Sequence, residues 1–196
     1  MYGEYKPHEY GKVILPMTVI KRFDDALKDT KKAVVEKNNE LNNSNKEVND
    51  KTRQAILKNV AKHDFYNTSK FDFAGLIADA DNIKENFTSY LQAFSDNVKD
   101  IIQRFDFFKE IDKMSENDLL YTIINEFNAK KADFSPNVVT AQDMGYIFEE
   151  LIRKFSESYD EQAGAHFTAR DIIYLMTELL VVNDKDELKK NGGSKT

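Results

Sequence analysis

The chain has 196 residues, of which 41% are hydrophobic and 32% are charged, and its formal net charge is −6 at pH 7. It contains no cysteine, which excludes disulfides, thiolate metal sites and cysteine nucleophiles. Its fourteen Phe and nine Tyr residues argue against disorder throughout the chain. No apolar run approaches the roughly 20 residues that a membrane-spanning helix needs, and the N-terminus lacks the apolar core of a secretion signal. We therefore expect a cytoplasmic protein with no membrane contact.

Few residues interrupt helices in this chain, which has only seven Gly and three Pro. Strand-like alternation is also scarce, and apolar residues recur mostly at steps of three and four. These patterns predict an all-α fold: an irregular multi-helix bundle with one long central helix and at most a minor, short strand pair. We expect the helical domain to span residues 1–182, followed by a polar linker over residues 183–196.

The first helix is expected to begin near Pro7 and to be kinked or divided by Pro16. Residues 29–64 are rich in Lys, Asn and Glu, and they predict two exposed helices joined near residues 42–45. Their charges are typical of a solvated face, with a specific binding surface as the alternative. Residues 64–80 are dense in aromatics and indicate a short strand or extended segment before a short helix. Core packing of these rings is favoured over stacking on bases.

The central helix is expected from Asp81 to Phe105, because apolar residues step by three and four over about six turns. Ser115 is then expected to cap a helix whose buried face is formed by Leu119, Leu120, Ile123, Ile124 and Phe127. A turn is expected at residues 135–137. Thr140 and Asp143 form a capping-box pattern at the start of the next helix.

Residues 161–180 (EQAGAHFTARDIIYLMTELL) are the most informative stretch. Gly164 suits a tight turn, and Thr168 with Asp171 repeats the capping-box pattern. The apolar steps predict a helix with one buried face, formed by Ile172, Met176, Leu179 and Val182. A helix start suits a carboxylate or phosphate ligand. The alternative is an ordinary capped core helix.

Catalytic patterns are missing from the rest of the chain. The three histidines are far apart and have no carboxylate cluster at ligand spacing, which argues against zinc. There is no Gly-rich phosphate loop, nucleophile elbow or fixed carboxylate pair. The negative net charge argues against a protein that coats nucleic acid, but it permits local DNA contact.

Several segments together resemble the methyltransferase (modification) subunit of type I restriction–modification systems, an adenine-N6 DNA methyltransferase, over nearly the whole chain. The most specific is AGAHFTAR at residues 163–170, which is similar to the family's Gly-x-aromatic-Phe-Thr-Pro-Arg signature. The others are Tyr5-Lys6, residues 9–16 (EYGKVILP), 21–24 (KRFD), 65–69 (FYNTS), 97–101 (NVKDI) and 144–153 (MGYIFEELIR).

The resemblance implies a cofactor, S-adenosylmethionine. Its methionine end would be lined by Ala165, His166, Phe167, Thr168, Ala169 and Arg170, with Ala169 where the family usually has proline. The family's Asp-Pro-x-x-Gly-x-Gly and Asn-Pro-Pro-aromatic motifs do not occur in this sequence. We therefore expect an N-terminal fragment that precedes the catalytic domain. Alone, it should neither methylate DNA nor bind the cofactor tightly.

The same resemblance implies roles in enclosing DNA and in subunit assembly. The partners would be DNA, the specificity subunit, a second methyltransferase subunit and, in the full complex, the restriction subunit. Lys6, Lys12, Lys21 and Arg22 are the candidates for contacts to backbone phosphates, with a solvated helix face as the alternative. The alternative function is a stand-alone helical protein–protein interaction module without a catalytic role.

Overall fold

The computed structural model describes residues 5–6, 9–44, 48–159 and 170–181. Helices dominate this part of the chain and it contains no β-strand, which confirms the all-α prediction. The chain divides into two compact units, Met1–Phe155 and Ser156–Thr196. The predicted boundary between residues 182 and 183 lies outside the described residues. Within the described ranges, no helix is long and apolar enough to cross a membrane.

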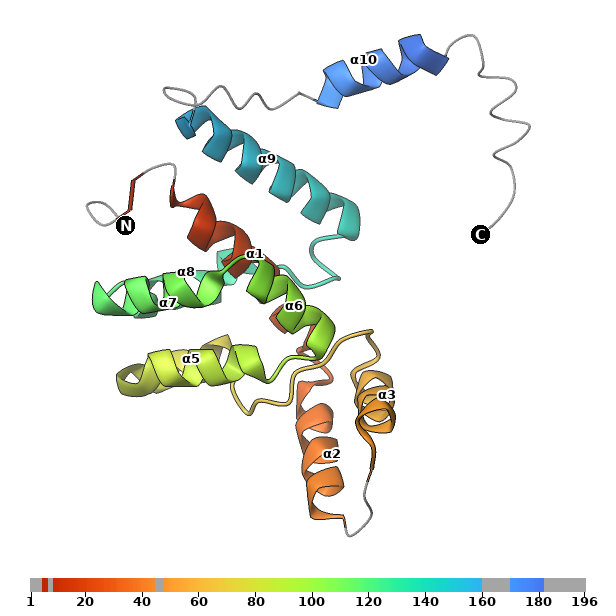
Figure 1. The fold of residues 1–196 in the computed structure, drawn as a ribbon, viewed down its shortest axis with the longest axis vertical. Coiled ribbons are helices and arrows are strands. Elements are labelled where there is room, and N and C mark those ends of the chain that lie inside the picture. Colours follow the sequence, from red (N-terminus) through yellow and green to blue (C-terminus); the bar gives the residue numbers. More distant parts are fainter. Residues whose placement is uncertain (1–4, 7–8, 45–47, 160–169, 182–196) are drawn as a thin grey trace. The chain divides into compact units, whose positions relative to one another are not determined.

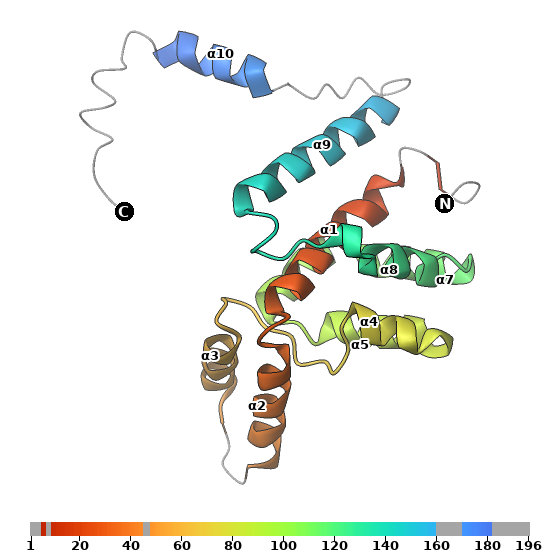
Figure 2. The ribbon, with the colours of Figure 1, turned by 180° about the vertical axis from the view of Figure 1, so that it is seen from behind.

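The first unit contains most of the helices, which Figures 1 and 2 show from opposite sides. In chain order the elements are α1 (Gly11–Leu27), α2 (Lys31–Asn43), α3 (Asp50–Ala61), α4 (Phe73–Ala78), the 3-10 turn η2 (Ala80–Asn82), α5 (Ile83–Gln92), α6 (Asp96–Arg104), α7 (Phe107–Glu116), α8 (Leu120–Asn128), the 3-10 turn η3 (Lys130–Ala132), α9 (Ala141–Tyr159) and α10 (Arg170–Val181). The last of these belongs to the second unit.

The core of the first unit lies among α1, α4, α5, α7 and α8, and it is built from aromatic rings. Phe87 and Tyr90 are fully buried, with ring centroids 6.2 Å apart. Phe73 meets Tyr90 edge-on at 6.3 Å, and Phe107 meets Phe87 edge-on at 6.3 Å. Such edge and offset arrangements add to the free energy that burial of the rings supplies. The predicted core role of the aromatics in residues 64–80 is confirmed for Phe73 and Tyr66, which are 1% and 8% exposed.

The N-terminal helices largely follow the sequence pattern. Helix α1 begins at Gly11 rather than near Pro7, and it continues through the buried Pro16 without dividing. The two predicted helices in residues 29–64 are present as α2 and α3. They pack together, and Arg53 of α3 donates to side-chain oxygens of Asn38 and Asn42 on α2 at 2.9 and 2.8 Å.

The predicted long central helix is wrong, because the chain breaks between α5 and α6. An extended segment at residues 66–68 forms hydrogen bonds with backbone groups between α5 and α6 that a continuous helix would use for its own hydrogen bonds. The Ser95 N–H donates to the Tyr66 carbonyl at 2.9 Å, and the Thr68 N–H donates to the Ala93 carbonyl at 3.0 Å. An isolated bridge joins Asn67 to Phe94. The predicted burial survives the break, since Phe87 and Val98 are at most 1% exposed.

Two further local predictions have opposite outcomes. Ser115 does not cap a helix, because α7 continues through it to Glu116 and buries Met114. The chain turns instead at Asp118, whose φ is 54°. The capping box at the start of α9 is confirmed: the Thr140 N–H donates to Asp143 Oδ2 at 3.0 Å, and the Asp143 N–H donates to Thr140 Oγ1 at 3.2 Å.

Helix α10 does not bury the predicted face within the residues that the structure describes. Ile172 and Met176 are 49% and 55% exposed, and Ile173, Tyr174 and Leu175 between them are exposed as well. The helix itself begins at Arg170, close to the predicted cap. Thr168 and the preceding turn lie outside the described residues.

Candidate functional site

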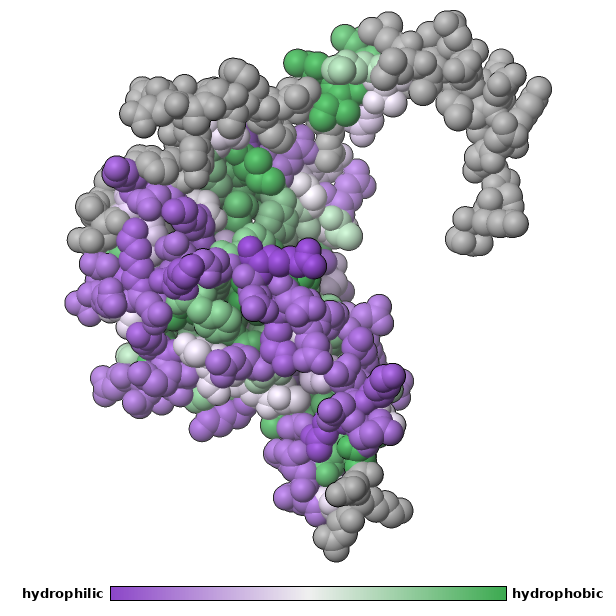
Figure 3. Space-filling view, viewed as in Figure 1, coloured by the Kyte–Doolittle hydropathy of each residue, from purple (hydrophilic) through white to green (hydrophobic). Residues whose placement is uncertain are grey.

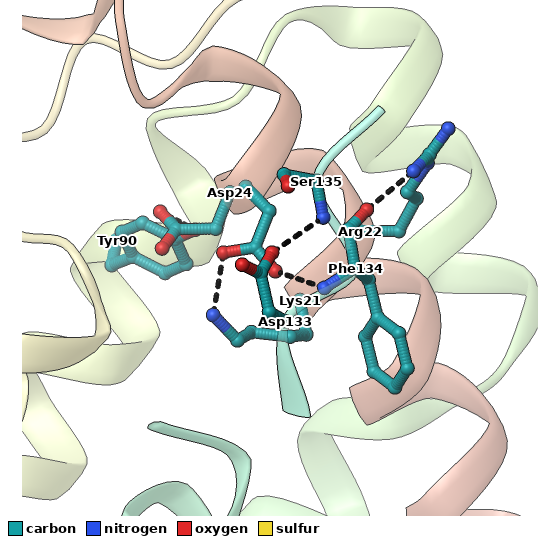
Figure 4. A network of polar contacts seen from close by, with 8 residues as sticks. Lys21, Arg22, Asp24, Tyr90, Asp133, Phe134 and Ser135 are labelled. Carbon is teal, nitrogen blue, oxygen red and sulfur yellow. Dashed lines mark hydrogen bonds and ion pairs between the residues drawn. The ribbon is translucent and has the colours of Figure 1, made fainter. Parts of the chain in front are cut away.

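Four charged residues in the second half of α1 form a polar site in the first unit. Lys21, Arg22, Asp24 and Asp25, here called the α1 cluster, occupy a little more than one helical turn. They reach in different directions, toward α5 and toward the segment that precedes α9 (Figure 4). The cluster therefore connects parts of the chain that are more than 60 residues apart in sequence.

Lys21 and Asp25 form an ion pair inside the protein. Their charged atoms are 2.5 Å apart, and their side chains are only 9% and 8% exposed. The second oxygen of Asp25 accepts a hydrogen bond from the Phe134 N–H at 2.8 Å. Removing either partner of such a pair leaves a buried charge without compensation, which is strongly destabilising.

Arg22 binds two backbone carbonyls in the segment before α9. Its Nη1 donates to the carbonyl of Phe134 and, at 2.8 Å, to that of Val139. A guanidinium suits this task because it is always charged and carries several donors in a rigid plane. The side chain is thus committed to contacts within the protein.

Asp24 points the other way, toward a buried tyrosine of α5. The Tyr90 hydroxyl donates to Asp24 Oδ1 at 2.8 Å. The ammonium of Lys31 lies 4.8 Å from the Tyr90 ring centroid and donates to Asn67 Oδ1 at 3.2 Å. Asn67 in turn donates to the Tyr90 carbonyl at 3.0 Å. These contacts tie α1, α5 and the start of α2 to the extended segment at residues 66–68.

Burial dominates the protonation behaviour of this group. It raises the pKa of Asp24, although the charge of Lys31 and the Tyr90 hydrogen bond oppose the shift. It also lowers the pKa of Lys31 to about 8, although Asp24 and Asp72 oppose that shift. Burial, followed by the charge of Asp24, raises the pKa of Tyr90 well above its usual value. All three shifts favour the uncharged side chain, as desolvation requires.

A cavity of about 170 Å³ adjoins the cluster. It is lined by Lys21, Asp24, Asp25, Lys28, Lys31, Asp72, Phe73, Ala74 and Asn128. Three lysines face three aspartates, so the lining charges balance. A balanced lining of this kind selects neither an anionic nor a cationic ligand.

The four candidates for DNA contact fall into two pairs. Lys6 is exposed, and the Lys12 side chain is 52% exposed and 3.6 Å from Glu9. Lys21 and Arg22 lie nine or more residues further along, roughly 14 Å at the rise of an α-helix, and both are engaged inside the protein. The structure does not bring the four together into one basic patch. Phosphate contact by any of them stays a prediction.

Most of the predicted cofactor residues, Ala165 to Ala169, lie outside the described residues. Arg170 is the first residue of α10, which places a helix start beside this segment, as the sequence predicts. Among the described side chains, no group of three or more His, Asp or Glu residues is arranged to hold a metal ion.

Sequence reasoning missed the Asp24–Tyr90–Lys31 group. The Lys21 and Asp25 spacing of four residues on one helix face was a usable signal for that ion pair. No local pattern pointed to Tyr90, which is 66 residues from Asp24.

A family model described as the HsdM N-terminal domain matches residues 1–127. The match spans α1 to α7 and nearly all of α8, and therefore includes the α1 cluster and the aromatic core. It stops short of α9, α10 and the segment at residues 163–170. No curated protein and no solved structure matches the chain.

Proposed function

Because the chain belongs to the HsdM N-terminal domain family, the N-terminal domains of type I restriction–modification methyltransferase subunits, we propose that it is the helical domain of a DNA adenine-N6 methyltransferase. The family match over residues 1–127 is the observation that carries this proposal. The all-α fold of the described residues agrees with a helical domain of this kind.

The proposed role has an assembly part. In the cytoplasmic complex the domain helps to enclose DNA, and it contacts the specificity subunit and a second methyltransferase subunit. The restriction subunit joins in the full complex. Helix α10 supports the need for partners, because a contiguous exposed apolar surface commonly marks a protein–protein contact. In the described part of α10, residues Ile172 to Met176 are each about half exposed or more, and Figure 3 shows hydrophobic surface there.

The second part concerns the cofactor. Ala165, His166, Phe167, Thr168, Ala169 and Arg170 are proposed to line the methionine end of S-adenosylmethionine, which the complete enzyme would use as methyl donor. The helix start at Arg170 supports this, because the N-terminus of a helix suits a carboxylate ligand.

The DNA contacts are proposed at Lys6 and Lys12, whose ammonium groups lie at the protein surface. Lysines at such positions add sequence-independent, salt-sensitive affinity for phosphates. Lys21 and Arg22 enter this role only by giving up contacts within the protein, so they are the weaker candidates.

The proposal is tested by joining this chain to the catalytic domain of a type I methyltransferase subunit and adding the matching specificity subunit. Transfer of labelled methyl groups to adenine in target DNA should then appear. Phe167→Ala should raise the KM for S-adenosylmethionine, whereas Tyr121→Ala, at an exposed position on α8, should leave it unchanged. No methylation above that of the catalytic domain alone would contradict the proposal. Co-purification with the specificity subunit without methylation would instead favour a protein–protein interaction module.

A further inference from the structure

The segment at residues 133–140, between η3 and α9, has little apolar anchorage. None of its side chains belongs to the buried core, and Val138 is 62% exposed. Its own turn is local, since the Ser135 carbonyl accepts from the N–H groups of Val138 and Val139. Phe134 and Val139 are only partly buried, so polar contacts also contribute to the attachment of this segment to the helical core.

Two side chains of α1 supply those contacts. Arg22 donates to the carbonyls of Phe134 and Val139, and Asp25 accepts from the Phe134 N–H at 2.8 Å. Arg22 and Asp25 are three residues apart and share one helix face. Phe134 is thus held at both of its backbone polar groups (Figure 4). Lys21 forms an ion pair with the other carboxylate oxygen of Asp25.

A second contact holds α9 to α1 near the other end of the two helices. Phe155 approaches Gly11 so closely that a Cβ built on Gly11 would lie 3.3 Å from the ring. Gly11 and Arg22 are about 16 Å apart along α1 at 1.5 Å per residue. The start of α9 therefore lies near Arg22 in the second half of α1, and Phe155 in the last part of α9 lies at Gly11, the first residue of α1. The two helices run antiparallel, as Figures 1 and 2 show.

Apolar packing alone does not account for the placement of α9. Met144 is buried at 7% exposure, but Phe148 and Leu151 are only partly buried and Ile152 is 45% exposed. We propose that Arg22 and Asp25 are positioning residues that fix the start of α9 on α1.

Hydrogen exchange of the 196-residue chain tests directly whether Arg22 and Asp25 hold the start of α9 on α1. Arg22→Met should speed amide exchange over residues 134–155 at least tenfold, while α5 and α7 stay unchanged. Lys32→Met, which removes a side chain that is 90% exposed, should change neither region. Unchanged exchange at residues 134–155, or an equal increase throughout the first unit, would overturn the proposal.

Gly11→Ala keeps the experiment decisive if Arg22→Met fails to fold. The added Cβ presses on Phe155, and alanine suits a helix. Faster exchange should then be confined to the part of α9 near Phe155, with the Phe134 amide still protected. Loss of protection at Phe134 in this variant would show that Arg22 and Asp25 do not hold the segment independently.

Discussion

Lys31 offers a sharp test of the energetics of the buried polar group. Burial lowers its pKa from 10.5 to about 8. Between these values the unfolded chain holds a proton on Lys31 that the folded chain has lost. Stability therefore rises with pH in this window, by about 1.4 kcal/mol per pH unit, and the whole shift corresponds to about 3 kcal/mol.

Lys31→Met should remove that contribution. Urea unfolding at pH 7, 8, 9 and 10 gives the free energy of unfolding for both proteins. Their difference should change by about 1.4 kcal/mol per pH unit between pH 8 and pH 10. The measurement stops at pH 10, because Tyr90 keeps its proton in the folded protein while an unfolded tyrosine ionises near that pH.

The matched control is Lys32→Met, at the neighbouring position, where the side chain is 90% exposed. Its free energy of unfolding should follow that of the wild type across the same pH range. Parallel pH profiles for the wild type and Lys31→Met would refute the reasoning, because they would mean that folding does not desolvate Lys31.

Three substitutions test other parts of the fold by urea unfolding or hydrogen exchange. Tyr90→Phe should cost about 1–3 kcal/mol, because Asp24 loses its buried donor, whereas Tyr121→Phe at an exposed position should cost almost nothing. Phe87→Ala should cost about 3–5 kcal/mol by leaving a cavity in the aromatic core; a loss below 1 kcal/mol would contradict that packing. Thr140→Ala should cost about 1 kcal/mol and speed exchange in the first turn of α9, because it removes the cap. Unchanged exchange there would argue against the capping box.

The fold class and much of the burial could be predicted from local sequence patterns. The scarcity of Gly and Pro and the steps of three and four predicted helices. They also identified Phe87 and Val98 as buried, which holds even though the helix is not continuous. The capping box at Thr140 and Asp143 was predictable because all of its hydrogen bonds join residues three apart. Interactions between residues this close in sequence can be predicted from the local residue pattern.

Interactions between residues that are far apart in sequence could not be predicted in this way. The break before α6 arises because Ser95 bonds to Tyr66, a residue that helix periodicity does not involve. Arg22 looked like a surface cation, but its partner Phe134 lies 112 residues away. A basic residue on a helix has the same local signature whether it meets solvent, a phosphate or a carbonyl. The distinction depends on which segment the fold places beside it.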